Sequence, residues 1–151
     1  MNQRLEIEIK GIKFEVQLLN KKASRTCQGI LEILPLELEG YHYFWSGEGI
    51  QIHDPILKKM ASDTGLWPDL LYPDTRENAK FNGTPGEIGF YPIGGSINIT
   101  YGQARFFGPP RGVESNYIFG VITNVEKLAE VGKTFKKVGG QKIQIRLKNQ
   151  K

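Results

Sequence analysis

The stretch GFYPIGGSINITYG, residues 89–102, decides between two fold classes for this chain. It nearly matches the phosphate-binding loop G-x-x-x-x-G-K-[ST], but Gly95 stands where that motif needs a lysine. A phosphate-binding loop also leads into a helix, whereas residues 96–101 alternate and are rich in β-branched side chains, which predicts a strand. Residues 87–91 predict a second strand, and Pro92 with the following glycines predicts a turn. We therefore interpret the stretch as a β-hairpin and expect no nucleotide site there.

The same alternation runs through much of the remaining chain. It predicts a hairpin and three further strand regions, which cover residues 5–18, 41–53, 117–122 and 143–147. Apolar residues spaced three and four apart predict two amphipathic helices, at about residues 22–34 and 124–131. Because closing a sheet on itself removes its exposed edges, we expect a mostly β protein, a closed barrel covered by these two helices.

The helix ends carry their own signals. We expect Asn20 or Ser24 to cap the first helix and Pro35 to stop it. Asn124 is expected to cap the second helix, and Gly132 is expected to end it in a left-handed conformation.

At 151 residues the chain is long enough to bury a core, and we expect one domain over residues 1–151. Residues 54–85 are the least regular part, with several prolines and the apolar residues Leu66, Trp67 and Leu70. A loop of this length is usually functional or mobile. A short helix around residues 56–62 fits its pattern.

Composition argues against several functions. The net charge is only +4, and basic residues are scattered among acidic ones, so we do not expect nucleic-acid binding, although the basic segment 133–151 keeps that alternative open. The chain has no apolar run that could span a membrane and no signal-peptide pattern, and its single cysteine, Cys27, fits a cytoplasmic location. Two histidines and one cysteine suggest no metal site, and we expect no cofactor.

The order of these elements resembles that of a known family. IKFEVQLLNKKASRTCQGILEILP, residues 12–35, and FGVITNVEKLAEVGKTFKKVGGQKIQIRL, residues 119–147, resemble the opening and the ending of cyclophilins. The middle of the chain resembles small bacterial and archaeal cyclophilin-like proteins of unassigned function, in the stretches WSGEGIQI (45–52), GEIGFYPIGGSINITYG (86–102) and SNYIFGVI (115–122). The resemblance covers most of the chain except residues 54–85, and it implies a cyclophilin-like barrel.

The resemblance does not extend to the isomerase residues. Rotation about an X–Pro bond faces a barrier of about 18–20 kcal/mol, and cyclophilins lower it with an arginine over an apolar, aromatic pocket. That arginine would fall within residues 41–53, which contain neither Arg nor Lys. The pocket histidine of cyclophilins corresponds to Asn116, and a pocket phenylalanine corresponds approximately to Ile99. The resemblance therefore implies the fold, and we do not expect the usual isomerase activity.

We interpret the chain as a binding module that holds a small molecule or a short peptide. The expected ligand-binding residues, aromatic or polar for the most part as ligand pockets require, are Tyr43, Trp45, Glu48, Tyr91, Ile99 and Asn116. Glu48 favours a ligand with a cationic or hydrogen-bond-donating group. Other roles remain open, namely core packing for the two aromatic residues of the 41–53 segment, solvent exposure for Glu48, and a bond to a neighbouring turn for Asn116.

Two enzymatic alternatives remain. The first is a divergent peptidyl-prolyl cis-trans isomerase, in which Arg105 or Arg111 reaches the groove from a later loop. The second is hydrolase or lyase chemistry at Glu48 with His42 or His53 as its partner. The sequence leaves the ligand, the oligomeric state and the role of residues 54–85 undetermined.

Overall fold

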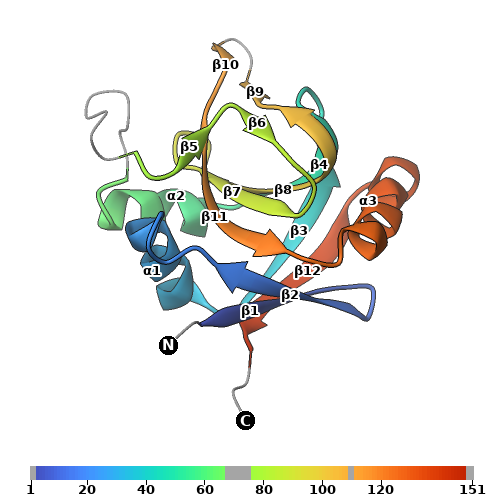
Figure 1. Cartoon of the computed structure of the whole chain (residues 1–151), viewed down its shortest axis with the longest axis horizontal. Helices are drawn as coiled ribbons and strands as arrows, with labels where there is room; N and C mark the ends of the chain where they lie inside the picture. Colours follow the sequence, from blue (N-terminus) through green and yellow to red (C-terminus); the bar gives the residue numbers. More distant parts are fainter. Residues whose placement is uncertain (1–2, 67–75, 109–110, 149–151) are drawn as a thin grey trace.

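The computed structural model describes residues 3–66, 76–108 and 111–148, and a closed antiparallel β-barrel dominates it (Figure 1). The barrel strands are β1 (Arg4–Ile9), β2 (Ile12–Leu18), β3 (Leu36–His42), β4 (Gly47–His53), β7 (Glu87–Tyr91), β8 (Ser96–Arg105), β11 (Asn116–Ile122) and β12 (Gln141–Leu147). The short strands β5 (Ala79–Lys80) and β6 (Asn82–Gly83) extend the same sheet, whereas β9 (Phe107–Gly108) and β10 (Gly112–Val113) pair only with each other.

The strand order runs β2-β1-β12-β3-β4-β8-β7-β11, and pairing of β11 with β2 closes the barrel. Every neighbouring pair is antiparallel. The hairpin expected over residues 89–102 is β7–β8, which turns through Gly95 at a φ of +65°. The prediction of a mostly β, closed barrel is therefore confirmed.

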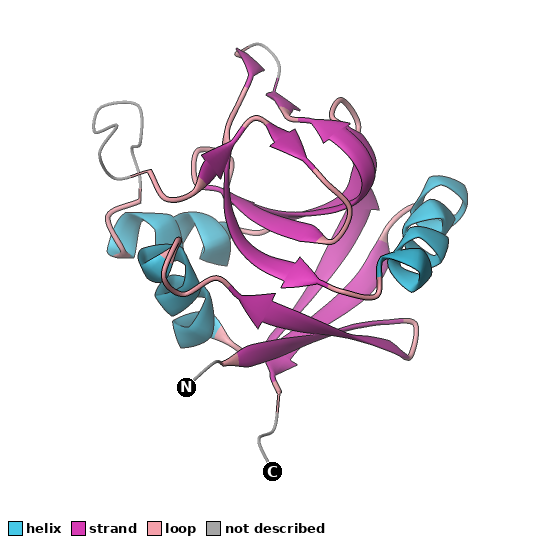
Figure 2. Ribbon diagram, viewed as in Figure 1, coloured by secondary structure: helices cyan, strands magenta, loops and turns pink. Residues whose placement is uncertain are grey.

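In the described parts of the chain, three helices lie against the barrel, namely α1 (Ser24–Ile33), α2 (Pro55–Asp63) and α3 (Val125–Val138). In Figure 2, α1 and α2 lie together on one side of the barrel and α3 lies on the opposite side. The helix expected around residues 56–62 is α2, which Asp54 caps by accepting a hydrogen bond from the Ile56 N–H at 3.0 Å. Among the described residues, no helix combines the length and the apolar character that a membrane span requires.

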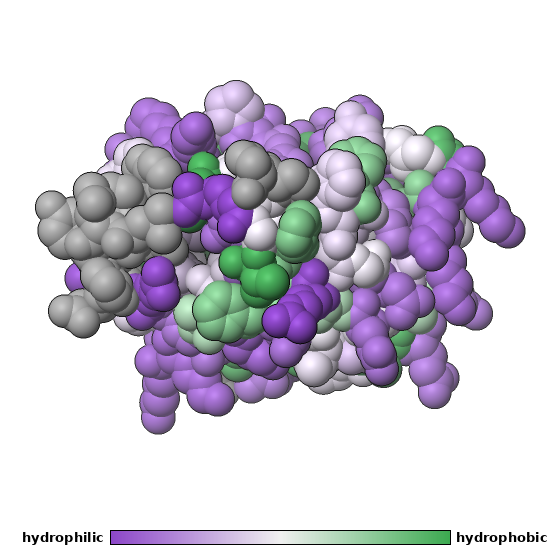
Figure 3. All heavy atoms as spheres, turned by 90° about the horizontal axis from the view of Figure 1, so that it is seen from above, coloured by the Kyte–Doolittle hydropathy of each residue, from purple (hydrophilic) through white to green (hydrophobic). Residues whose placement is uncertain are grey.

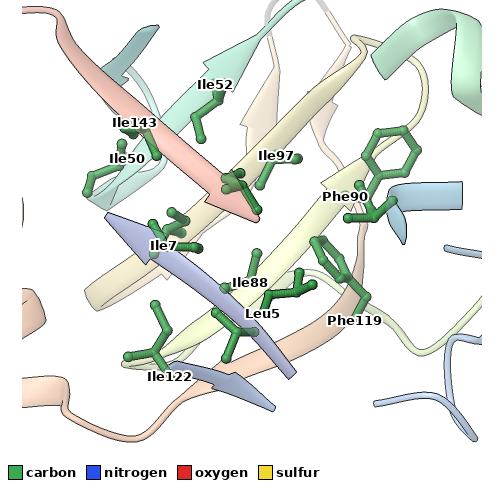
Figure 4. Close-up of a cluster of buried hydrophobic side chains, with 14 of the residues drawn as sticks. Leu5, Ile7, Ile50, Ile52, Ile88, Phe90, Ile97, Phe119, Ile122 and Ile143 are labelled. Carbon is green, nitrogen blue, oxygen red and sulfur yellow. The ribbon is translucent and has the colours of Figure 1, made fainter. Parts of the chain in front are cut away.

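The main core fills the barrel interior. Alternate residues of neighbouring strands point inward and meet there, including Ile7, Ile50, Ile97 and Ile143 (Figure 4). Each of these four side chains is at most 1% exposed. Burial of one such side chain stabilises the fold by about 1.5–3 kcal/mol, so the inward positions determine which face of every strand turns outward.

Helix α3 continues seven residues beyond the predicted end at residue 131. We expected Gly132 to end it, but that prediction is wrong, because Gly132 is buried in the helix against the ring of Tyr101. A Cβ at residue 132 would overlap this ring, so the glycine allows close packing of helix on barrel. The helix ends instead at Gly139, whose φ is +83°. Asn124 caps its start, as predicted, by accepting a hydrogen bond from the Lys127 N–H at 3.3 Å.

Helix α1 begins differently from the prediction. Its N-cap residue is Ala23, and neither Asn20 nor Ser24 caps it with a side chain. Glu77 supplies the acceptor from far along the chain, and its carboxylate takes hydrogen bonds from the N–H groups of Arg25 at 2.9 Å and Thr26 at 2.7 Å. The irregular segment 54–85 therefore supports α1. Trp67 and Leu70, which we singled out in that segment, lie outside the described residues.

Candidate functional site

A pocket of about 430 Å³ lies on the outer face of the barrel. On β8, Ile97 and Ile99 point into the core, so the alternate residues Ser96 and Asn98 point outward and line this pocket. The full lining consists of Tyr41, Tyr43, Phe44, Trp45, Ser46, Gln51, His53, Tyr91, Ser96, Asn98, Phe106, Phe107, Gly108, Glu114 and Asn116. Its residues come from β3, β4, β7, β8, β9, β11 and their connections.

Tyr43 is held firmly at the pocket wall. Its ring lies against Gly49, where any Cβ would overlap it, and its hydroxyl is 3.1 Å from Thr100 Oγ1. Burial raises the pKa of the Tyr43 phenol, so the group stays protonated at neutral pH. Only 6% of Tyr43 is exposed, and the residue packs with Phe106 and Ile118 in a small second core beneath the pocket.

The connection that carries Phe44 and Trp45 is tied to the segment that carries Phe107. The Ser46 carbonyl accepts a hydrogen bond from the Arg105 N–H at 2.9 Å, and Ser46 Oγ accepts one from the Phe107 N–H at 3.0 Å. These bonds hold two aromatic segments side by side at the pocket mouth. Phe44 is 70% exposed and Trp45 is 64% exposed, which leaves their surfaces available to a ligand.

Exposed hydrophobic side chains also gather around the mouth. Figure 3, which looks down on the face that carries β9 and β10, shows hydrophobic atoms grouped among hydrophilic ones. Phe107 on β9 and Val113 on β10 are each 42% exposed. Contiguous apolar surface of this kind commonly marks a binding site.

A pair of buried amides forms the polar part of the pocket. Asn98 Nδ2 donates to Asn116 Oδ1 at 2.6 Å and to Ser96 Oγ at 3.3 Å. Asn98 is 8% exposed and Asn116 is 3% exposed. Asn98 lies on β8 and Asn116 on β11, and the intervening strand β7 places Gly89 between them. Neighbouring strands are about 4.8 Å apart, so the amides meet only because Gly89 has no side chain.

Glu114 supplies the one carboxylate among the described residues that line the pocket. Arg111 Nε donates a hydrogen bond to it, which neutralises much of its charge. Among the described residues that line the pocket there is no Arg or Lys. Arg105 and Arg111, the two arginines considered for isomerase chemistry, both lie outside the lining.

The pocket brings together four of the six residues predicted to bind a ligand. Tyr43, Trp45, Tyr91 and Asn116 all line it, although they come from three separate parts of the chain, namely the β3–β4 connection, β7 and β11. Whether they bind a ligand stays a prediction. For Trp45, exposure removes the alternative of core packing, whereas Tyr43 both packs in the second core and lines the pocket.

The pocket does not include Ile99 or Glu48. Ile99 is fully buried in the main core, because it alternates with Asn98 and so points to the opposite face of β8. Glu48 lies beside a bulge in β4, where its carboxylate accepts a hydrogen bond from the Gln103 N–H at 3.1 Å. The ligand preference that we attached to Glu48 therefore has no support from this pocket.

The structure does not support the catalytic alternative at Glu48 either, because it does not place Glu48 and a histidine together in the pocket. His53 lines the pocket, but it stands at the other end of β4 from Glu48. His42 lies outside the pocket lining. Its Nε2 is 2.7 Å from the Tyr101 hydroxyl, and its imidazole ring packs edge-on against the Tyr101 ring. In the described ranges, no group of three or more His, Cys, Asp or Glu residues is arranged to hold a metal ion.

Sequence reasoning missed Asn98, Gln51 and the phenylalanines at 106 and 107. A signal for Asn98 was present, because an amide in the middle of a strand between two isoleucines needs a polar environment on the outward face. The phenylalanines carried no such signal, since only the folded chain brings their segment against residues 43–46.

Comparison with known families now places the chain. A family model described as "Protein of unknown function (DUF3830)" matches residues 5–147. The chain belongs to this family. A search of curated proteins finds no sequence match to this DUF3830 member.

Three solved structures share its fold. McbB, solved in complex with tryptophan, matches with a TM-score of 0.67 and 16% identity over 97% of this chain, which spans only 45% of McbB. The hypothetical protein AF2241 from Archaeoglobus fulgidus matches with a TM-score of 0.58 and 17% identity, over 96% of this chain and 94% of AF2241. A cyclophilin-type peptidyl-prolyl cis-trans isomerase from Cryptosporidium parvum matches with a TM-score of 0.59 and 16% identity over the whole of both chains. The fold of this DUF3830 protein is therefore cyclophilin-like, as the resemblance implied.

Proposed function

We propose that this protein is a binding module whose outer pocket holds a small molecule or a short peptide. The observation that carries the proposal is the make-up of the pocket, in which aromatic walls surround the buried pair Asn98 and Asn116. Binding sites for small molecules typically have volumes of about 300–1,000 Å³, apolar walls and a few precisely placed polar groups. The volume of about 430 Å³ falls within this range.

The same make-up argues against the usual isomerase chemistry. A cyclophilin-type mechanism needs a cationic donor near the prolyl nitrogen, and the described lining offers amides, hydroxyls, an imidazole and the carboxylate of Glu114. Arg111 lies outside the lining, and its Nε is engaged by Glu114. Divergent isomerase activity therefore serves as the competing outcome of the test.

The test is a titration of the ¹⁵N-labelled full chain, followed by amide chemical shifts. The compounds are aromatic carboxamides, aromatic amines and tryptophan, which is the compound in the McbB structure, together with a proline-containing peptide. Saturable shifts confined to the backbone amides around Trp45, Tyr91 and Asn116 would support the proposal.

A matched pair of variants localises the response. Trp45→Ala removes a pocket aromatic, and Phe81→Ala removes an aromatic that is 52% exposed but lies outside the lining. We expect only the first substitution to weaken binding. Faster cis-trans exchange of the proline peptide would favour the isomerase instead, and no shift with any compound would contradict a binding role for this pocket.

A further inference from the structure

Which ligand the pocket selects depends on the atoms of the amide pair that remain available. An Asn side chain has two N–H donors on its nitrogen, and its oxygen only accepts. Asn98 Nδ2 uses its donors on Asn116 Oδ1 and Ser96 Oγ. Within the described parts of the chain, Asn98 Oδ1 and Asn116 Nδ2 have no hydrogen-bond partner. Since both residues line the pocket, they present one acceptor beside one donor.

This arrangement is complementary to an amide whose N–H and C=O lie on the same edge. The ligand N–H would donate to Asn98 Oδ1, and the ligand C=O would accept from Asn116 Nδ2. The two asparagines are bonded to each other, so the acceptor and the donor belong to adjacent side chains. A trans peptide bond points its N–H and C=O in opposite directions, whereas a lactam or a primary carboxamide presents both on one edge.

The remaining lining favours a flat, uncharged body for that ligand. Aromatic residues such as Trp45 and Tyr91 stack well on planar rings. An anionic ligand would find no Arg or Lys among the described lining residues to balance its charge, and Arg111, outside the lining, is already paired with Glu114. A cationic ligand would have to compete with Arg111 for that same carboxylate.

We infer that the pocket selects a neutral, planar compound with a lactam or carboxamide edge, which Asn98 and Asn116 recognise together. This inference rests on the proposed function, because it assigns a ligand class to the same pocket. It favours a small heterocycle over a peptide.

Four matched probes test the inference on the unmodified full chain. They are 2-quinolone, N-methyl-2-quinolone, quinoline and quinoline-2-carboxylate, which share a flat bicyclic body. Binding is followed by the side-chain amide resonances of Asn98 and Asn116 and by the backbone amides of Trp45 and Tyr91. We expect 2-quinolone to bind most tightly and N-methylation to weaken binding about tenfold, because it leaves a buried acceptor without its donor.

A variant that changes one free atom gives an independent test. Asn116→Asp keeps the acceptor for Asn98 but replaces the free donor with an acceptor, so the affinity for 2-quinolone should fall about tenfold or more. The control is Asn82→Asp, the same chemical change at an exposed residue of β6 outside the lining, which should leave the affinity unchanged. If Asn116→Asp fails to fold, the affinities of the four probes for the unmodified chain still test the inference.

The outcomes separate the two proposals. If N-methyl-2-quinolone or the carboxylate binds as tightly as 2-quinolone, with shifts at Trp45 and Tyr91, the pocket binds ligands but the amide edge is not recognised. That result overturns the inference and leaves the proposed function standing. If none of the probes and none of the compounds in the wider titration shifts these residues, both proposals fail.

Discussion

Glu77 caps helix α1 through Thr26, a residue that precedes it by 51 positions. Glu77 Oε1 accepts hydrogen bonds from the Thr26 N–H at 2.7 Å and from Thr26 Oγ1 at 2.8 Å. The N-cap residue Ala23 has no side-chain acceptor, so the first turn of the helix depends on this carboxylate. Its negative charge also complements the positive end of the helix dipole.

Replacing Glu77 should therefore destabilise the fold. We expect Glu77→Ala to lower the free energy of unfolding by about 1–3 kcal/mol, from the lost cap and the lost dipole interaction. Urea denaturation of the full chain measures the change. Glu130→Ala on the exposed side of α3 is the control, since its ion pair with Lys127 is solvent-exposed and should contribute less than about 1 kcal/mol. Equal stability of the two variants would show that the cap is unimportant.

Gly132 gives a second stability prediction, with opposing effects to weigh. Ala is favoured over Gly within a helix by about 1 kcal/mol, but a Cβ at residue 132 would overlap the ring of Tyr101. Overpacking of this kind costs about 1–3 kcal/mol. We expect Gly132→Ala to lower the melting temperature, whereas Lys133→Ala at the neighbouring exposed position should leave it nearly unchanged. A higher melting temperature for Gly132→Ala would mean that α3 shifts freely on the barrel.

Cys27 should be inert while the protein is folded. Burial, aided by the nearby charge of Glu77, raises the pKa of the Cys27 thiol to about 12. Only the deprotonated form, the thiolate, reacts with such reagents. Because the folded-state pKa lies far above pH 8, almost none of the Cys27 side chain is ionised at that pH. We expect no reaction with a disulfide reagent at pH 8 in buffer and complete reaction in denaturant. Rapid labelling in buffer would show that α1 opens readily.

The pocket and the core should respond differently to substitution. Trp45 is 64% exposed, so Trp45→Ala should change the free energy of unfolding by less than about 0.5 kcal/mol while it weakens ligand binding. Phe90 is fully buried in the main core, and Phe90→Ala should cost about 3–5 kcal/mol. Thermal unfolding followed by circular dichroism measures both. A large loss of stability for Trp45→Ala would indicate a packing role.

Gly89 should control the amide pair. A Cβ at this position would lie 2.9 Å from Asn116 Cβ and 3.1 Å from Ile118 Cδ1, so Gly89→Ala should push Asn116 away from Asn98. We expect the side-chain amide resonances of both asparagines to shift and the affinity for amide ligands to fall. Gly11→Ala offers a contrast, because nothing lies within 4 Å of its Cβ position, although its φ of +79° adds strain there. An unchanged amide spectrum in Gly89→Ala would argue against the contact across β7.

The sequence predicted the barrel because strand alternation is a local property. Each inward Ile or Leu marks its strand and its buried face, and no long-range information is needed. The end of α3 was mispredicted because a glycine can either end a helix or allow close packing within it. Only the position of Tyr101 in the folded protein shows that Gly132 has the second role. The acceptor for α1 was mispredicted because Glu77 acts across a long separation in the chain.

The site could be predicted only in part for a similar reason. Tyr43, Trp45, Tyr91 and Asn116 were chosen for their aromatic or polar side chains, and the fold brings all four to one pocket. Ile99 was chosen by its alignment to a cyclophilin pocket residue, although it is Asn98 beside it that points into the pocket. The pocket lies on the face of β8 that does not meet the core. The packing of the whole barrel determines which face that is.

The alternation along β8 has one more consequence, which concerns how such a protein changes over time. Ile97 and Ile99 are buried in the main core, whereas Ser96 and Asn98 line the pocket. Substitutions at Ser96 and Asn98 can therefore change the shape and polarity of the pocket without touching the interior that keeps the chain folded. None of the described lining residues belongs to the main core, so the same barrel can carry pockets of different composition.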